Sequence, residues 1–272
     1  MSPRHDAGLD LPGDRRSAPA DWCEQWTFDA VFTDPRDGSV LLGVAVGVGR
    51  RPALGRGWYH AVVVGPGRDT VSVVDTDLAV SNGAGGLELR SPGLWADHNP
   101  TAAFGHWTVA AEAFGVALED PWEAWGRAFG APQPVGLDLE WDPVPGADLA
   151  GLDPIDADLG GTWRVGCEVH GVVLVADERH EVIGFGTRGR SWGTALPVAK
   201  GHHWMWWRDD NGSWFTHAAR SDPDRDPRDA PSPAVSVTAW APVLGGGGTP
   251  LAQAVVRCDD GSRSGVGWLH QR

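Results

Sequence analysis

Short runs of β-favouring residues recur at regular intervals along the chain, and this rhythm restricts its fold more than any other feature. Gly, Pro and Asp separate the runs, and these residues end strands and form turns. The expected strands cover roughly residues 22–33, 39–49, 57–65, 69–79, 86–95, 103–118, 163–176, 181–186, 202–208, 213–218, 234–244, 251–258 and 264–270. Asn211-Gly212 between two aromatic runs is a strong hairpin signal. The pattern predicts an all-β protein with antiparallel strands.

Changes in composition divide the chain. Residues 1–20 are rich in Pro, Gly, Asp and Arg, so we expect a disordered leader. Residues 146–162 are acidic and rich in Gly, without a clear period, which is typical of a linker. We therefore expect an N-terminal β domain over 21–145 and a C-terminal β domain over 163–272.

One short helix is expected near residues 121–129. Asp120 is a good N-cap, Pro121 suits the first helical position, and Glu123 lies three residues after the cap. Trp122 and Trp125 follow at helical spacing.

Charge and cysteine content narrow the function. The 22 Lys and Arg residues against 36 Asp and Glu give a net charge of −14, which disfavours partners such as nucleic acid and anionic lipid. No apolar run is long enough for a membrane span. The N-terminus lacks the apolar core of a signal peptide, so we expect a cytoplasmic protein. The three Cys form no Cys-x-x-Cys pair, and we expect neither disulfides nor a metal site.

Tryptophan is unusually abundant, with 16 Trp against a single Tyr. Strand alternation places Trp204 and Trp206 on one face of residues 202–208. Because the opposite face is also aromatic, one face is expected to pack in a core and the other to line a cavity or a second domain. Packing on both faces is the alternative. His202 and His203 point apart, so this strand alone cannot offer both to a metal.

Glu168 and His170 lie on the same face of an otherwise apolar expected strand. Burial disfavours the charged form of a carboxyl group, so a desolvated Glu168 can act as a proton donor, with His170 as its companion. A purely structural hydrogen-bonded pair is the alternative interpretation.

A set of spaced residues resembles a known superfamily. It comprises Glu168-x-x-Gly171, then Gly184-x-Gly186-x-Arg188-x-x-Ser191-Trp192-Gly193, with a matching opening Glu24-x-Trp26-x-Phe28 in the first half. In this respect the chain is similar to the hydroxyneurosporene synthase (carotenoid 1,2-hydratase) and AttH-like superfamily. Where that family usually reads Arg-Asp-His-Ser-Trp-Gly, this chain has Gly189 and Arg190, and thus lacks the acidic residue and the His.

The resemblance implies two tandem antiparallel lipocalin-like β-barrel or curved-sheet domains. It also implies an enzyme of the hydratase, cyclase or isomerase type that acts on an isoprenoid- or polyketide-like molecule. We expect no cofactor. The expected catalytic residues are Glu168 and His170, and the expected ligand-binding residues are Trp26, Arg188, Trp192, Trp204 and Trp206.

Three functions remain open from the sequence. The first is acid catalysis on an apolar small-molecule ligand in a Trp-lined cavity, where aromatic faces stabilise cationic intermediates. The second is a non-catalytic carrier of an apolar ligand, which the altered motif favours. The third is a carbohydrate-active or carbohydrate-binding protein, because Trp stacks on sugars and Glu24, Glu140 and Glu168 are candidate carboxylates. The sequence does not indicate the oligomeric state.

Overall fold

The computed structural model describes residues 10–12, 17–80, 86–119, 130–150, 160–194, 202–220, 235–245, 249–259 and 264–271. Within these ranges the chain forms β-strands and one short 3₁₀ helix, Pro52–Leu54. No helix among the described residues is long and apolar enough to cross a membrane. The prediction of an all-β protein is therefore confirmed for the described part of the chain.

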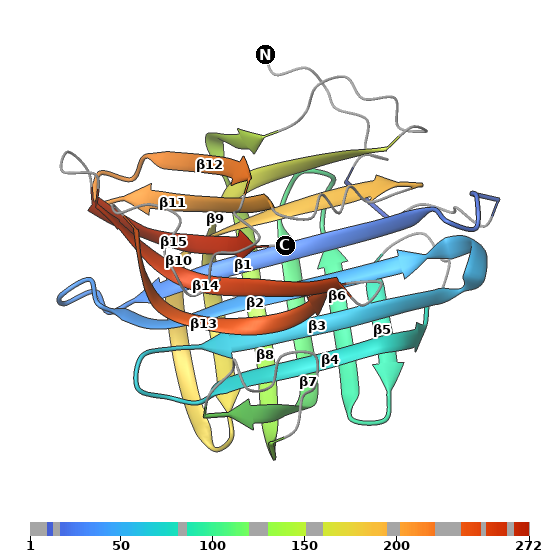
Figure 1. The fold of residues 1–272 in the computed structure, drawn as a ribbon, viewed down its shortest axis with the longest axis horizontal. Coiled ribbons are helices and arrows are strands. Elements are labelled where there is room, and N and C mark those ends of the chain that lie inside the picture. Colours follow the sequence, from blue (N-terminus) through green and yellow to red (C-terminus); the bar gives the residue numbers. More distant parts are fainter. Residues whose placement is uncertain are drawn as a thin grey trace.

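Ten strands form one antiparallel sheet in the order β4-β3-β2-β1-β10-β9-β8-β7-β6-β5. They are β1 (Cys23–Thr33), β2 (Val40–Arg51), β3 (Arg56–Val64), β4 (Thr70–Ala79), β5 (Leu87–Ser91), β6 (Leu94–Pro100), β7 (Trp107–Leu118), β8 (Ala131–Ala150), β9 (Gly161–Val175) and β10 (Glu178–Gly193). Strand β4 also pairs with β7, from Thr70 opposite Leu118 to Ser72 opposite Val116. This pairing closes the sheet into a ring of hydrogen bonds, and in Figure 1 strands β1–β4 run across strands β5–β8.

The interior of the ring is apolar because one face of each strand carries large side chains. In β1 the inward residues are Trp26, Phe28, Ala30 and Phe32, each at most 1% exposed. The rings of Trp107 and Trp141, which β7 and β8 contribute, lie 5.5 and 5.4 Å from that of Phe28. Inward apolar residues at every second position are what a barrel core requires.

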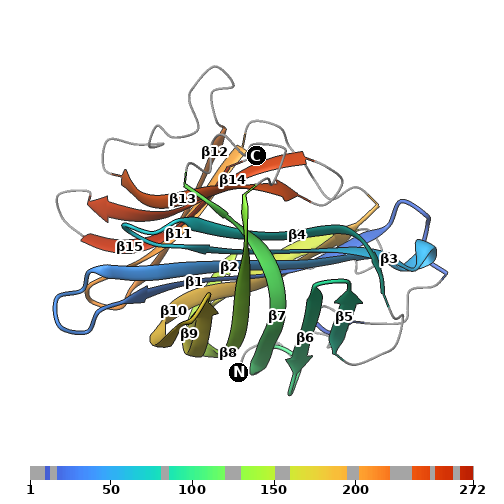
Figure 2. The ribbon, with the colours of Figure 1, turned by 90° about the horizontal axis from the view of Figure 1, so that it is seen from below.

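Five further strands form a second antiparallel sheet in the order β12-β11-β15-β14-β13. They are β11 (His202–Asp209), β12 (Trp214–Arg220), β13 (Val235–Gly245), β14 (Thr249–Asp259) and β15 (Ser264–Gln271). Figure 2 shows this sheet as a separate layer against strands β1–β4. Trp206 and Trp268 fill the space between the layers and contact a cluster that includes Val31 and Val62. Both faces of β1–β3 are thus covered.

Most expected strands are present, and the hairpin at Asn211-Gly212 is confirmed. Gly212 has φ of 84°, a conformation that glycine adopts without steric cost, and β11 and β12 pair around it. The helix expected over residues 121–129 lies outside the described residues.

The sheets do not follow the expected domain limits of 21–145 and 163–272. Strands β9 and β10 were assigned to the second domain, yet both hydrogen-bond into the first sheet, where β10 pairs with β1 from Cys23 opposite Gly193 to Phe32 opposite Gly184. Strand β8 also runs to Ala150, inside the expected linker of 146–162. The ring requires β9 and β10 to join β8 to β1, so the first sheet extends to Gly193.

Candidate functional site

The expected site residues lie in three separate places. Trp26, Arg188 and Trp192 come together inside one end of the barrel, where each is at most 3% exposed. Trp206 lies between the two sheets. Glu168 and His170 are on the outer surface of the barrel. The side chain of Trp204 lies outside the described part of the structure.

The buried end of the barrel contains paired charges rather than a free acid. Glu24 accepts hydrogen bonds of 2.6 Å from Arg50 and of 2.6 Å from Arg190, and all three side chains are at most 1% exposed. The Arg190 guanidinium lies 4.9 Å from the centroid of the Trp26 ring and 5.1 Å from that of Trp192. Burial lowers the pKa of Arg190, and the Glu24 carboxylate offsets part of that effect. Glu24 is thus a shared counter-ion for two arginines.

Arg188 is held by the N-terminal segment. Its guanidinium donates to the Asp10 carboxylate at 3.0 Å and to the Gly105 carbonyl at 2.9 Å. Asp10 also accepts from the Phe104 backbone amide, and its carbonyl accepts from the Trp26 indole at 2.8 Å. Asp10 is fully buried, so the expectation of a disordered leader over residues 1–20 is wrong at this position. The buried arginine supplies the reason, because an unpaired guanidinium in the core is costly.

His98 is a further buried polar group inside the barrel. Its ring lies 5.5 Å from that of Phe28 and 5.9 Å from that of Tyr59. Neither ring nitrogen has a hydrogen-bond partner among the described residues. Burial lowers the pKa of His98 to about 3, so the imidazole is neutral at ordinary pH.

The expectation that Glu168 is desolvated is wrong. Glu168 and His170 are both exposed on the outer face of β9, while Cys167 and Val169 between and beside them point into the barrel. The sequence pattern identified the alternation correctly but could not show which of the two faces was the inner one. Burial raises the pKa of the Cys167 thiol to about 12, so the thiolate that would react is scarce.

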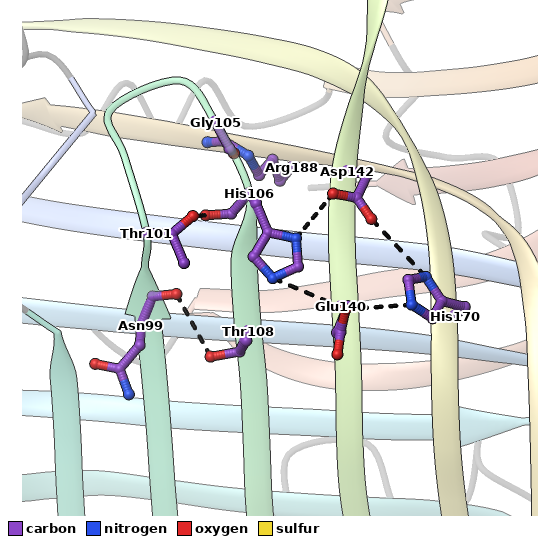
Figure 3. Close-up of polar contacts among 9 residues, drawn as sticks. All are labelled: Asn99, Thr101, Gly105, His106, Thr108, Glu140, Asp142, His170 and Arg188. Atoms are coloured by element: carbon purple, nitrogen blue, oxygen red, sulfur yellow. Dashed lines mark hydrogen bonds and ion pairs between the residues drawn. The ribbon is translucent and has the colours of Figure 1, made fainter.

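His170 belongs to a group of four side chains on β7, β8 and β9, which we call the outer His–carboxylate cluster: His106, Glu140, Asp142 and His170 (Figure 3). His170 Nε2 lies 3.2 Å from Glu140 Oε2, and His106 Nδ1 lies 2.8 Å from Asp142 Oδ1. Each side chain is 26–49% exposed. One ligand atom each from His106, Glu140 and Asp142 can lie within 4.8 Å of the others, so this cluster can hold a cation.

An apolar groove of about 570 Å³ opens farther down the same face of the barrel. Its walls include Trp95, Phe114, Leu174 and Glu112, with Arg90 at one side. In the strand register Trp95 lies opposite Glu112, Glu112 opposite Gly136, and Gly136 opposite Leu174. Because Gly136 has no side chain, the Leu174 side chain can lie over it, only 2.9 Å from where a Cβ of residue 136 would stand. None of these residues was among the expected site residues.

A search of solved structures finds proteins that match this fold, a closed β-barrel with a second antiparallel sheet on its outside. A protein of Nitrosomonas europaea that is provisionally assigned as AttH has a TM-score of 0.57 and 14% sequence identity to this chain. The match covers 95% of this chain and 93% of that one. The resemblance to AttH-like proteins is thus confirmed at the level of the fold.

Two structures of CghA also match. One, solved with the small molecule Sch210972, has a TM-score of 0.40 and 13% identity over 98% of this chain and 95% of that chain. The other has a TM-score of 0.36 and 13% identity over 92% and 87%. No family model and no curated protein matches the sequence.

Proposed function

We propose that this protein is a carrier that binds an apolar small molecule of isoprenoid or polyketide type in the outer groove. The observation that carries the proposal is a groove of about 570 Å³ whose wall includes Phe114, a side chain that is 68% exposed. A large aromatic group left in water beside Leu174 and Trp95 is typical of a ligand-binding surface. The groove has the size of many small-molecule sites.

Two charged groups at the groove are consistent with a ligand that has a polar end. Glu112 is exposed and projects beside Gly136, while Arg90 is paired with Glu88 at 2.6 Å. A carboxylate and a guanidinium at one side of an apolar wall can orient a hydroxyl or carbonyl group.

The exposure of Glu168 favours the carrier over the acid-catalysed hydratase or cyclase. Glu168 lies in water on the outer face of β9, so it lacks the desolvated environment that the catalytic alternative requires. Inside the barrel, Glu24 is occupied by Arg50 and Arg190.

The test compares substitutions inside and outside the groove. Purified protein is titrated with a fluorescent isoprenol, a polyketide, a fatty acid and an oligosaccharide. Phe114→Ser should weaken binding of the apolar probes about tenfold, because loss of a partly buried aromatic contact costs on the order of 1.4 kcal/mol. Ile183→Ser is the matched control, since Ile183 is 80% exposed and does not line the groove.

Equal affinity of both variants and wild type would refute the groove as the site. Binding of the oligosaccharide alone would instead favour the carbohydrate-binding alternative. Turnover of any bound probe, retained in Glu168→Gln, would show an enzyme that uses another acid.

A further inference from the structure

Three neighbouring strands bring two histidines and two carboxylates to one patch of the barrel surface. Glu140 and Asp142 are two residues apart on β8, so both point outward, and His170 lies opposite Glu140 on β9. His106 directly precedes the inward Trp107 of β7 and points outward beside Asp142. Figure 3 shows both imidazole rings turned toward the carboxylates that lie between them.

The distances within the outer His–carboxylate cluster are near those between the ligands of a metal ion. His106 Nδ1 lies 2.8 Å from Asp142 Oδ1, and the other ring nitrogen, Nε2, lies 3.9 Å from Glu140 Oε2. His170 Nε2 lies 3.2 Å from Glu140 Oε2, and its Nδ1 lies 3.9 Å from Asp142 Oδ2. Two ligand atoms bound to a tetrahedral Zn²⁺ at about 2.0–2.2 Å lie roughly 3.3–3.6 Å apart. One imidazole offers a single nitrogen to an ion, and one such atom each from His106, Glu140 and Asp142 already lie within 4.8 Å of one another. Rotation of these partly exposed side chains would bring the three atoms to the spacing of a bound ion.

The strand register adds a charge argument that is independent of these distances. Asp142 lies directly opposite Glu168 on β9, and like charges in that position repel each other. Glu140 is two residues from Asp142 on the same face. Three carboxylates thus gather around two imidazoles, and a bound cation would neutralise part of their charge.

We propose that this cluster is a binding site for a divalent transition-metal ion of the Zn²⁺ type. His106, Glu140 and Asp142 each supply one ligand atom. His170 is a positioning residue that holds Glu140 through Nε2. An imidazole ligand favours Zn²⁺ and its neighbours over Mg²⁺ and Ca²⁺, which prefer oxygen ligands. The exposed side of the cluster leaves a coordination position open to water or to another ligand.

The proposal is tested by metal binding to the full chain after treatment with a chelator. Zn²⁺ is titrated calorimetrically, and Co²⁺ is added to read its visible absorption as a report of the coordination geometry. Wild type should bind Zn²⁺ at this site. His106→Gln and Asp142→Asn should each weaken that binding by at least about 100-fold, and His170→Gln by about 10–100-fold. Circular dichroism confirms that each variant is folded.

His180→Gln is the matched control. His180 is 27% exposed against 26% for His106, and it lies beside a carboxylate, Glu178, at 3.3 Å. Its substitution should leave Zn²⁺ affinity and the Co²⁺ spectrum unchanged. The proposal is overturned if wild type binds no Zn²⁺, if His106→Gln binds as tightly as wild type, or if Ca²⁺ binds as tightly as Zn²⁺ and is unaffected by His106→Gln.

Discussion

Glu24 is the residue on which the buried charges of the barrel depend most. It is fully buried and its two oxygens accept from Arg50 and Arg190 separately. Bringing three charges into an apolar interior is costly, and only their mutual contacts and the adjacent Trp faces offset the lost hydration. Removal of the Glu24 charge would deprive both buried arginines of the carboxylate that they share.

We therefore predict that Glu24→Gln lowers the free energy of unfolding by about 3–5 kcal/mol. Urea unfolding followed by circular dichroism measures the effect. Glu88→Gln is the control, because Glu88 and its partner Arg90 are 54% and 72% exposed and such surface pairs contribute little to stability. Equal losses in the two variants would contradict a special role for the buried pair.

His98 should make the stability of the protein depend on pH. Its pKa is about 3 in the folded protein, against 6.5 for an ordinary histidine, so below pH 6.5 the unfolded state takes up the proton first. Stability should then fall by about 1.4 kcal/mol per pH unit from this residue alone. Between about pH 7 and pH 5, wild type should lose roughly 2 kcal/mol more than His98→Phe, which cannot be protonated. Urea unfolding at the two pH values gives this difference, and the same slope in both proteins would disprove the assignment.

At the scale of single residues, the sequence identified part of the candidate site. The motif that contains Arg188 and Trp192, and the one that contains Trp26, do meet inside the barrel, since β1 and β10 are paired neighbours. The outer cluster was missed because His106, Glu140 and His170 come from three strands, and only the register brings them together.

At the scale of elements, β8 shows how strand signals were obscured. Val135, Leu137, Leu139 and Trp141 alternate inward, as a half-buried strand requires. Prolines interrupt the same stretch at 132, 134, 143 and 145, and proline within a run argues against a strand. The stretch nevertheless forms a strand, because its inward side chains complete the barrel core. The strands without proline, such as β2 and β3, were predicted close to their observed limits.

Residues 10–12 act as part of the barrel although these three residues form no strand. We predict that Asp10→Ala lowers the free energy of unfolding by about 3–5 kcal/mol, since Arg188 would be buried with the Gly105 carbonyl as its one acceptor among the described residues. Thermal unfolding tests this. Asp77→Ala is the control, because Asp77 pairs with Arg56 on the surface. A normal melting temperature for Asp10→Ala would show that the segment is dispensable.

At the scale of the whole molecule, the two sheets are joined by tryptophan. Trp206 and Trp268 are fully buried between the layers, and the Trp214 ring lies 5.6 Å from that of Trp206. Trp206 was expected to bind the ligand, with packing as the alternative, and it packs in the contact between the two sheets.

Trp268→Ala should therefore destabilise the contact between the sheets by about 3–5 kcal/mol. Limited proteolysis should then cut the second sheet faster than the barrel, because the barrel core does not contain Trp268. Leu54→Ala, at a residue that is 53% exposed, is the control. Uniform cleavage of both sheets at the wild-type rate would contradict this prediction.

The pairing of β1 with β10 has a consequence for synthesis of the protein. Cys23 emerges early from the ribosome, but its partner Gly193 is translated much later, on the order of ten seconds at usual elongation rates. Until then one edge of β1 in the nascent chain has no β10 to pair with. An unpaired strand edge is a template for aggregation. Production of this protein should therefore depend strongly on holdase chaperones and on the speed of translation before Gly193.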